Sequence, residues 1–376
     1  MIGLICVSFQ SFAYVEYAAR FRINDCTACH LSPVGGGPRT VYGKLFGAHG
    51  YKLNPVLVQD YVAADLRALF YYPQNPGPSK GGMGIMSGSI AGHVALDENK
   101  KFQVTIEHNV GGFSAAPYRD TYFLYRANKS FSFLTGRFRA PFGIVTDEHR
   151  TYTRIQTGTE WFTMQTGLLF SGNPKDVFHY DIGAFSGEDS TGQTLNPGMA
   201  ERWGAIANVR WMPGAIILGA SYLHFDRGPG ADAKKAETFY SVISLGRITA
   251  DRVPLSLTLE YTRASNADAN LGKGFASDST YVDALGKAES EGWLAWLNWE
   301  LSWKLFLVYK LDWLTPDRGF PADVYTRHGV GVRWVFAPGA IFQARTEFAS
   351  ATHPSEDAKT GTGAQNATFG LLQVAF

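Results

Sequence analysis

Apolar and polar residues alternate in short segments from about Gly81 to the end of the chain, and turn residues separate these segments. The segments 101–110 and 255–262 place most of their aliphatic or aromatic side chains on one face and polar or charged side chains on the other, and in 304–313 the apolar residues at 305, 307, 309, 311 and 313 alternate with Lys304, Lys310 and Asp312. Successive side chains of a strand point to opposite faces, so this period of two predicts β-strands. In a membrane barrel the apolar face meets lipid, aromatic residues girdle both interfaces, and the polar face lines the lumen.

The lengths of the connections predict how such a barrel is threaded. Tight turns at 128–130, 212–214, 302–304 and 337–339 alternate with long polar loops around 143–160, 187–200, 264–291 and 351–366. Outer-membrane barrels have short periplasmic turns, long external loops and an even number of strands. Counting back from a periplasmic Phe376 gives about fifteen strands, the earliest near 83–96. Either an additional strand near 60–72 completes about sixteen, or the preceding segment threads the lumen.

Composition narrows the class of protein. The chain has 376 residues, of which 45% are hydrophobic, 14% aromatic and 18% charged. This apolar content excludes a disordered chain, and no uncharged apolar run approaches the ~20 residues of a membrane-spanning helix. The net charge of +1 provides no basic field for nucleic acid. We therefore expect an all-β fold, a transmembrane barrel of about sixteen antiparallel strands over residues 81–376 in the outer membrane of a Gram-negative bacterium.

Aromatic residues support a barrel over a soluble β-sandwich, which remains the alternative because alternation is a weak signal for each strand. The final segment 372–376 alternates and ends in Phe376, which resembles the signal by which outer-membrane barrels are recognised for insertion. Tryptophans in or at the ends of predicted strands are Trp293, Trp296, Trp299, Trp303, Trp313 and Trp334. We expect these aromatic side chains to lie at the two membrane interfaces.

The first thirteen residues, MIGLICVSFQSFA, form a short apolar run that ends in small residues before Tyr14. This pattern predicts a signal peptide over 1–13. The usual positive n-region is missing, so the leader is either atypical or begins upstream. The alternative is a buried strand of the mature protein.

Residues 26–30 read Cys-Thr-Ala-Cys-His, the C-x-x-C-H attachment signature of c-type haem. Thiols at this spacing can bond to the two vinyl groups of one porphyrin, and His30 then reaches the iron as proximal axial ligand. Half a zinc site would need two more Cys or His ligands at matching spacing, and a disulfide between Cys26 and Cys29 would be strained. We expect one covalent haem c on a segment spanning 14–80.

The iron needs a further ligand or an open site, and His or Met is the usual partner. The stretch 39–50 has helical spacing, and His49 near its end is the candidate distal ligand. The other interpretation of His49 is a polar residue at a helix C-terminus. The alternative distal ligands are Met83, Met86, His93 and His108, in or near the first predicted strands.

A c-type haem motif at the head of a porin-like barrel resembles the fused monohaem cytochrome–porin family of the outer membrane, whose best-known members are iron oxidases. The resemblance covers the whole chain: leader, Cys26/Cys29/His30 motif, intervening segment and barrel. It implies that Cys26 and Cys29 anchor the haem by thioether bonds and that His30 is an axial ligand. It fixes no distal ligand.

Three functional hypotheses follow. The first, implied by the resemblance, is an electron-transfer conduit from an extracellular donor such as Fe(II), through one haem c, to a periplasmic cytochrome or other acceptor. The second is a passive porin in which the haem segment is a structural plug or a redox gate. The third is a soluble periplasmic cytochrome with an attached sandwich, against which the C-terminal strand argues. Enzymatic activity, if present, would be electron transfer alone.

Overall fold

The computed structural model describes most of the barrel and parts of the N-terminal segment. The described residues are 15–21, 23, 28–30, 43, 62–73, 81–112, 118–145, 151–157, 159, 164–175, 177–189, 203–226, 233–265, 289–302, 304–315, 318, 324–337, 340–351 and 366–375. The predicted signal peptide, Cys26 and His49 lie outside them.

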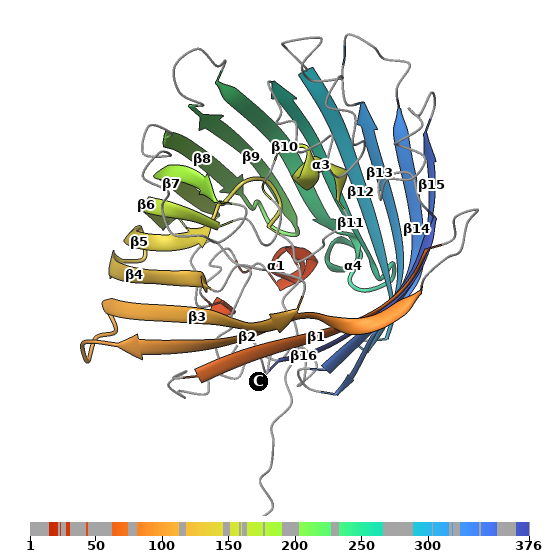
Figure 1. Cartoon of the computed structure of the whole chain (residues 1–376), viewed down its shortest axis with the longest axis horizontal. Helices are drawn as coiled ribbons and strands as arrows, with labels where there is room; N and C mark the ends of the chain where they lie inside the picture. The colour runs from red at the N-terminus through yellow and green to blue at the C-terminus, as the bar shows by residue number, and fades with distance from the viewer. Residues whose placement is uncertain are drawn as a thin grey trace, which may run out of the picture.

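Sixteen antiparallel strands form a closed barrel in which each strand pairs with its sequence neighbours and β1 pairs with β16 (Figure 1). The strands are β1 (Val62–Pro73), β2 (Gly82–Ala95), β3 (Phe102–Gly112), β4 (Tyr118–Asn128), β5 (Phe131–Arg139), β6 (Met164–Lys175), β7 (Phe178–Asp189), β8 (Trp203–Trp211), β9 (Ile216–Phe225), β10 (Lys234–Ser244), β11 (Leu255–Ser265), β12 (Glu289–Ser302), β13 (Leu305–Thr315), β14 (Tyr325–Ala337), β15 (Ala340–Ala351) and β16 (Ala367–Ala375). The described helices are α1 (Val15–Phe21), α3 (Tyr152–Ile155) and α4 (Leu245–Ile248). The expected all-β fold and strand number are confirmed.

The barrel begins at Val62, so the expected boundary at residue 81 is corrected: β1 lies within the range 14–80 that was assigned to the haem segment. The strand near 60–72 that the strand count required is therefore present, and it closes the barrel by placing Asp65 opposite Ala375. The register of β1 against β2 shifts at Arg67 and Ala68, which pair with Ser87 and Ile85, so the extra residue of this bulge lies on β2. β1 itself alternates, but its inward positions include Ala63, Leu69 and Tyr71, so its two faces differ little in polarity and alternation alone hardly reveals the strand.

The predicted turns and loops are also confirmed. The tight turns join β4 to β5, β8 to β9, β12 to β13 and β14 to β15, and the long loops join β5 to β6, β7 to β8, β11 to β12 and β15 to β16. Turns of one kind therefore share one end of the barrel, which is the periplasmic end by the rule that external loops are the long ones. β1 starts and β16 ends at that same end.

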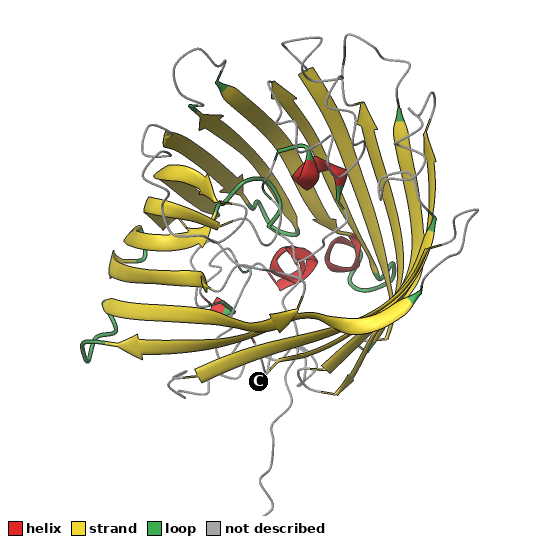
Figure 2. Cartoon of the chain, viewed as in Figure 1, coloured by secondary structure: helices red, strands yellow, loops and turns green. Residues whose placement is uncertain are grey.

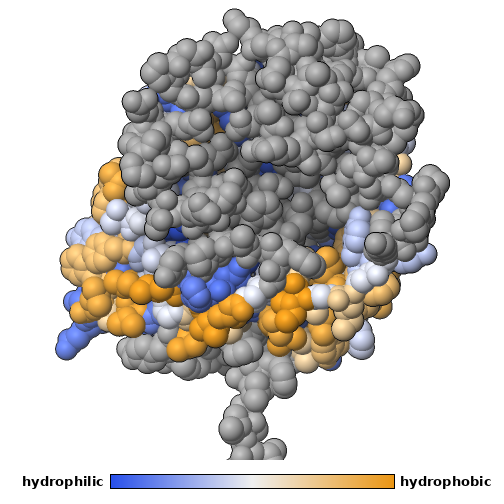
Figure 3. Space-filling model, viewed as in Figure 1, coloured by the Kyte–Doolittle hydropathy of each residue, from blue (hydrophilic) through white to orange (hydrophobic). Residues whose placement is uncertain are grey.

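The outer face of the barrel is apolar. On β3, Phe102, Ile106 and Val110 are 40%, 51% and 57% exposed, whereas Thr105 and Glu107 between them are buried. Figure 3 shows apolar side chains over the visible outer face of the barrel. An apolar outside with polar residues inward is the pattern of a barrel that spans an outer membrane. None of the described helices is long and apolar enough to cross a bilayer.

Tryptophan side chains on the outer face of the barrel lie near both of its ends. On β12, Trp293 lies toward the long-loop end and Trp299 toward the short-turn end, and both are about half exposed. Trp203 and Trp211 stand likewise at the two ends of β8. Trp296 does not join them: it is 8% exposed and points inward, which corrects its expected place in a girdle. The reason is parity, because three positions separate Trp296 from Trp293 and Trp299 and an odd spacing reverses the face of a strand.

Candidate functional site in the barrel lumen

Helix α1 lies inside the ring of strands (Figure 2). Its sequence, VEYAARF, places Tyr17 and Phe21 four residues apart and so on one face of the helix. Tyr17 is 5% exposed and packs edge-on against Phe306, with ring centroids 6.2 Å apart. These residues of α1 pack on a patch of inward apolar side chains, which we name the first seat. The first seat consists of Trp296, Phe306, Val308, Val335 and Ile341.

A second apolar seat receives the other face of α1. Ala19 is fully buried, and Ala18 packs beside it. The seat consists of Ile144, Met212, Ile217, Tyr240 and Val242, so most of it lies near the short-turn ends of β8, β9 and β10. Porin interiors are usually polar. Two apolar patches on the inner wall, each covered by α1, therefore indicate that this helix is part of the folded barrel.

An ionic contact holds the C-terminal turn of α1 at the periplasmic end. The Arg20 guanidinium donates a hydrogen bond to a Glu300 carboxylate oxygen and lies 3.1 Å from Oδ1 of Asp251. Glu300 is near the end of β12, and Asp251 is in the connection from β10 to β11. Arg20 is largely buried and Asp251 is exposed, so the pair with Glu300 contributes more to holding the helix.

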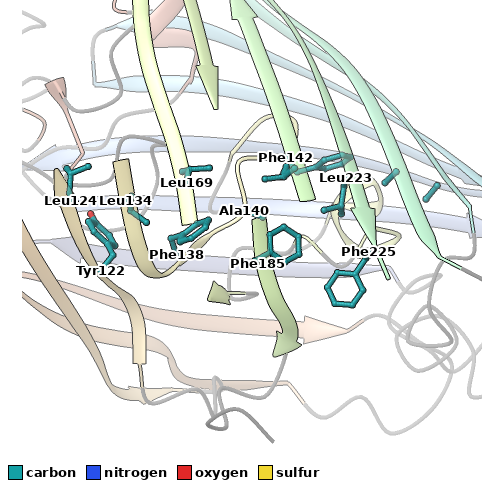
Figure 4. Packing of buried hydrophobic residues seen from close by; sticks show 13 residues of the cluster. Tyr122, Leu124, Leu134, Phe138, Ala140, Phe142, Leu169, Phe185, Leu223 and Phe225 are labelled. Carbon is teal, nitrogen blue, oxygen red and sulfur yellow. The ribbon is translucent and has the colours of Figure 1, made fainter. Parts of the chain in front are cut away.

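The connection between β5 and β6 also folds into the lumen. Ala140 and Phe142, just after β5, pack against inward residues of β4 to β10, among them Leu134, Phe185 and Leu223 (Figure 4). This is a third apolar region of the inner wall, and again an inserted segment covers it.

Polar contacts attach the connection between β5 and β6 to more distant strands. The Arg154 guanidinium on α3 donates to Oε1 of the buried Glu260 on β11 and, 2.7 Å away, to the Phe142 carbonyl. The Gly143 amide donates to Ser221 Oγ at 2.9 Å. The Arg327 guanidinium of β14 lies 4.2 Å from the centre of the Tyr152 ring. The β5–β6 segment therefore bridges the lumen from one wall to the other.

Gly143 permits the chain to pass the Arg154–Glu260 ion pair. Its φ is +59°, a left-handed conformation that favours glycine. A Cβ at this position would overlap both Oε1 of Glu260 and the Arg154 guanidinium.

The remaining inner wall between β6 and β10 is polar and hydrogen-bonded. Asp181 accepts from Ser171 Oγ at 2.6 Å and from Asn208 Nδ2 at 2.8 Å, and His179 Nε2 lies 2.9 Å from it. Asn208 in turn accepts from the Tyr240 hydroxyl at 2.9 Å. This network connects the wall to the second seat of α1.

The described part of the haem motif is shielded from solvent. Cys29 and His30 are 7% and 9% exposed, and their short segment is drawn in red inside the barrel outline in Figure 1. Gly43 packs directly on this segment, since a Cβ built there would lie 2.6 Å from Cys29 Cα and would overlap the Cys29 carbonyl oxygen. A c-type haem is anchored by thioether bonds from two Cys side chains and is bound through the iron by the adjacent His, so the buried Cys29 and His30 fit two of the three residues that this group uses.

The alternative distal ligands divide between the two faces of the barrel wall. Met83 is 82% exposed, and His108 is exposed on the outer face, so both point away from the lumen. His93 lies opposite the buried Thr105, with Nδ1 2.9 Å from Thr105 Oγ1, and Met86 is buried. Within the described residues, no group of three or more His, Cys, Asp or Glu side chains is placed to hold a metal ion.

Sequence reasoning missed the lumen contacts of Tyr17, Arg20, Gly143 and Arg154. The spacing of Tyr17 and Phe21 was a usable signal for α1, although seven residues are few for periodicity. The Arg154–Glu260 pair joins residues 106 positions apart, for which one sequence contains no signal.

Comparison with solved structures agrees on the fold. The structure of OmpF of Salmonella typhi in complex with daunomycin has a TM-score of 0.62 at 10% identity, covering 84% of this chain and 97% of that one. A loop L8 deletion mutant of OmpT, an outer-membrane protein of Vibrio cholerae, has a TM-score of 0.60 at 12% identity over 84% and 98% of the two chains. An anion-selective porin of Comamonas acidovorans has a TM-score of 0.59 at 11% identity, also over 84% and 98%. No protein-family profile and no curated protein matches the sequence. The chain therefore has the fold of a porin-like outer-membrane barrel.

Proposed function

We propose that this chain is a porin-type channel of the outer membrane whose lumen is narrowed by an N-terminal plug, and that the plug bears one haem c. The observation that carries the proposal is the seating of α1 on two apolar patches of the inner wall. In a water-filled pore such patches would expose apolar surface, which costs about 25 cal/mol for each Å². A plug that covers them removes this cost and narrows the path for solutes.

Residues of the chain would hold the haem as follows. Cys26 and Cys29 would form the thioether bonds, His30 would bind the iron, and His49 is the candidate for a second protein ligand. A bound haem supplies one-electron chemistry whose potential depends on the axial ligands and on burial. The burial of Cys29 and His30 favours a site that excludes water.

Electron transfer is the second candidate function, and the C-x-x-C-H motif favours it. In this alternative the barrel insulates the plug, and electrons pass from an extracellular donor such as Fe(II) to a periplasmic acceptor.

One experiment separates the two candidates. The full chain, matured with a haem c ligation system, is reconstituted into vesicles that enclose an oxidised cytochrome. A channel predicts solute flux, measured by vesicle swelling, that is increased by Arg20→Glu, because the reversed charge repels Glu300 and loosens the plug. A conduit predicts that external Fe(II) reduces the enclosed cytochrome without solute flux and that Cys26→Ala/Cys29→Ala abolishes the reduction. Absence of flux in both the wild type and Arg20→Glu would contradict the channel.

A further inference from the structure

The connection between β10 and β11 differs from the other connections at the short-turn end of the barrel. It spans 245–254, whereas the connections from β4 to β5, β8 to β9 and β14 to β15 are tight turns. Its first residues form α4, which lies inside the ring of strands and in contact with α1 (Figure 2). Periplasmic turns of outer-membrane barrels are short, so reversal of the chain does not require this length.

Hydrogen bonds hold this connection in one shape. Thr249 Oγ1 donates to the Leu245 carbonyl at 2.8 Å and accepts from the Val253 amide at 3.0 Å. Ala250 and Asp251 have φ angles of 51° and 63°, in the left-handed region that side chains other than glycine adopt at a cost. Backbone strain of this kind persists only where the surrounding structure fixes it, and it is concentrated at binding sites.

The connection presents two apolar side chains between two arginines. Ile248 is 55% exposed and Val253 is 39% exposed. Arg247 and Arg252 are exposed beside them, and neither forms an ion pair with another residue that the structure describes. We name these four residues the docking surface. The one acidic residue of the connection, Asp251, already lies 3.1 Å from the Arg20 guanidinium, so the docking surface is positively charged.

The position of the docking surface indicates a soluble partner. Lipid surrounds the outside of the barrel, whereas α4 lies within the ring of strands at the periplasmic mouth (Figure 1). A small apolar centre with a charged rim is the anatomy of a protein–protein interface. Complexes between electron carriers are at the low end of interface size, below about 1,200 Å². A rim of arginine favours a partner whose own surface is acidic.

The docking surface also lies close to the haem motif. Arg20, in the last turn of α1, contacts Asp251 of the same connection. Cys26 follows Arg20 by six positions, and a chain of this length spans at most about 22 Å when fully extended. A partner seated beside Asp251 is therefore near the point at which the haem motif begins.

Resting on the haem-bearing plug proposed above, we infer that the docking surface binds a soluble periplasmic electron carrier with an acidic surface. Exchange with such a carrier moves one electron between two metal centres. One centre is oxidised by one electron as the other is reduced by one, and no bond forms or breaks. The arginines attract and orient the carrier, and Ile248 and Val253 supply the apolar contact.

The test measures binding of one small carrier in two charge states. The probes are mitochondrial cytochrome c, whose lysines make it basic, and the same protein after succinylation, which replaces lysine ammonium groups by carboxylates. The full chain, matured with haem, is held in phosphatidylcholine nanodiscs, and binding is measured by biolayer interferometry. We expect the succinylated probe to bind at least about tenfold more tightly than the native one at low salt. The difference should disappear in molar salt, where the screening length is about 3 Å.

Variants locate the binding. Arg247→Glu/Arg252→Glu should weaken binding of the succinylated probe by at least about tenfold, because like charges then face each other. Ile248→Ser should weaken it in molar salt as well, because it removes apolar contact. The matched control is Lys101→Glu/Lys175→Glu, which changes the net charge equally at exposed positions of the same barrel end and should leave binding unchanged. Heat-modifiable mobility on a detergent gel shows that each variant is folded, and Arg247→Gln/Arg252→Gln repeats the test without reversed charge.

The outcomes that would overturn the proposal are distinct. Equal binding of both probes, or unchanged binding in Arg247→Glu/Arg252→Glu, would contradict the docking surface. Equal weakening in Lys101→Glu/Lys175→Glu would show that the charge of the whole barrel end attracts the probe. With phosphatidylglycerol added to the nanodiscs, altered lipid retention as the only effect of Arg247→Glu/Arg252→Glu would show that the surface binds lipid headgroups.

Covalent haem staining separates failure of this inference from failure of the proposed function. A wild type that carries no covalent haem would overturn the haem-bearing plug, and with it the identification of the partner as an electron carrier. A wild type that stains for haem and does not bind the succinylated probe would overturn the docking surface alone.

Discussion

The ion pair between Arg154 and Glu260 should determine whether the β5–β6 segment stays across the lumen. We consider Glu260→Gln, which removes the charge and preserves the volume and the contact with Thr238. Both side chains of the pair are almost fully buried, at 4% and 0% exposure. Breaking a buried pair by removing one partner costs about 3–5 kcal/mol, because the other charge remains buried without compensation. Arg154 keeps its bond to the Phe142 carbonyl. We therefore expect the low end, about 3 kcal/mol.

The measurement is urea unfolding of the barrel in phospholipid vesicles, followed by tryptophan fluorescence, together with the ion conductance of each variant. Glu260→Gln should lower the free energy of unfolding by about 3 kcal/mol and raise the conductance, because the segment through Gly143 loses its ion pair with β11 and is held by fewer contacts. The double variant Arg154→Met/Glu260→Leu is the matched control. Replacing both charges by apolar groups of similar volume is often neutral, so it should be more stable than Glu260→Gln alone.

A cost below about 1 kcal/mol for Glu260→Gln would refute this reasoning. Such a value is typical of exposed ion pairs. It would mean that water reaches the pair, and that the apolar contacts of Ala140 and Phe142 suffice to keep the segment in the lumen.

Three further predictions concern the haem motif and the lipid face. Cys26→Ala/Cys29→Ala should abolish covalent haem staining while the barrel still runs heat-modifiably on a detergent gel; staining that persists would contradict the haem assignment. Gly43→Ala should shift the midpoint potential of the haem, because a Cβ there would overlap Cys29 and burial tunes the potential; Gly92→Ala, whose Cβ would meet nothing, should leave the potential unchanged. Phe239→Lys, at a lipid-facing position of 57% exposure in the middle of β10, should cost about 2–4 kcal/mol in urea unfolding from vesicles; an unchanged midpoint would show that this position is not in the bilayer core.

The barrel could be predicted from the sequence because its physical rule is local. A strand between lipid and a polar lumen must alternate, and the segment 101–110 does so with His108 as the one polar residue on its apolar face. Short turns and long loops then order the strands. β1 was not recognised directly because Ala63, Leu69 and Tyr71 make its inward face partly apolar, and only the requirement for an even number of strands indicated it.

The contents of the lumen could not be predicted in the same way, because the sequence pattern does not distinguish two reasons for an apolar side chain. Trp296 and Phe306 are apolar because a helix covers them inside the barrel, whereas Trp293 is apolar because lipid covers it outside. A tryptophan side chain is consistent with either environment. Only parity along the strand separates them, and parity is reliable only when the register is known.

Contacts with the inner wall of the barrel hold α1, the helix of the proposed plug, in place. An inward apolar patch that faced water would be energetically unfavourable. Helix α1 covers the two seats, and the two seats in turn hold the helix in the lumen. Each large side chain that leaves its seat loses about 1.5–3 kcal/mol of burial, and Tyr17 is such a side chain, with 5% exposure. Arg20 adds an ionic contact at the periplasmic mouth. Displacing α1 as a whole would forfeit these contributions together, so the proposed channel would pass solutes beside the plug and not by releasing it.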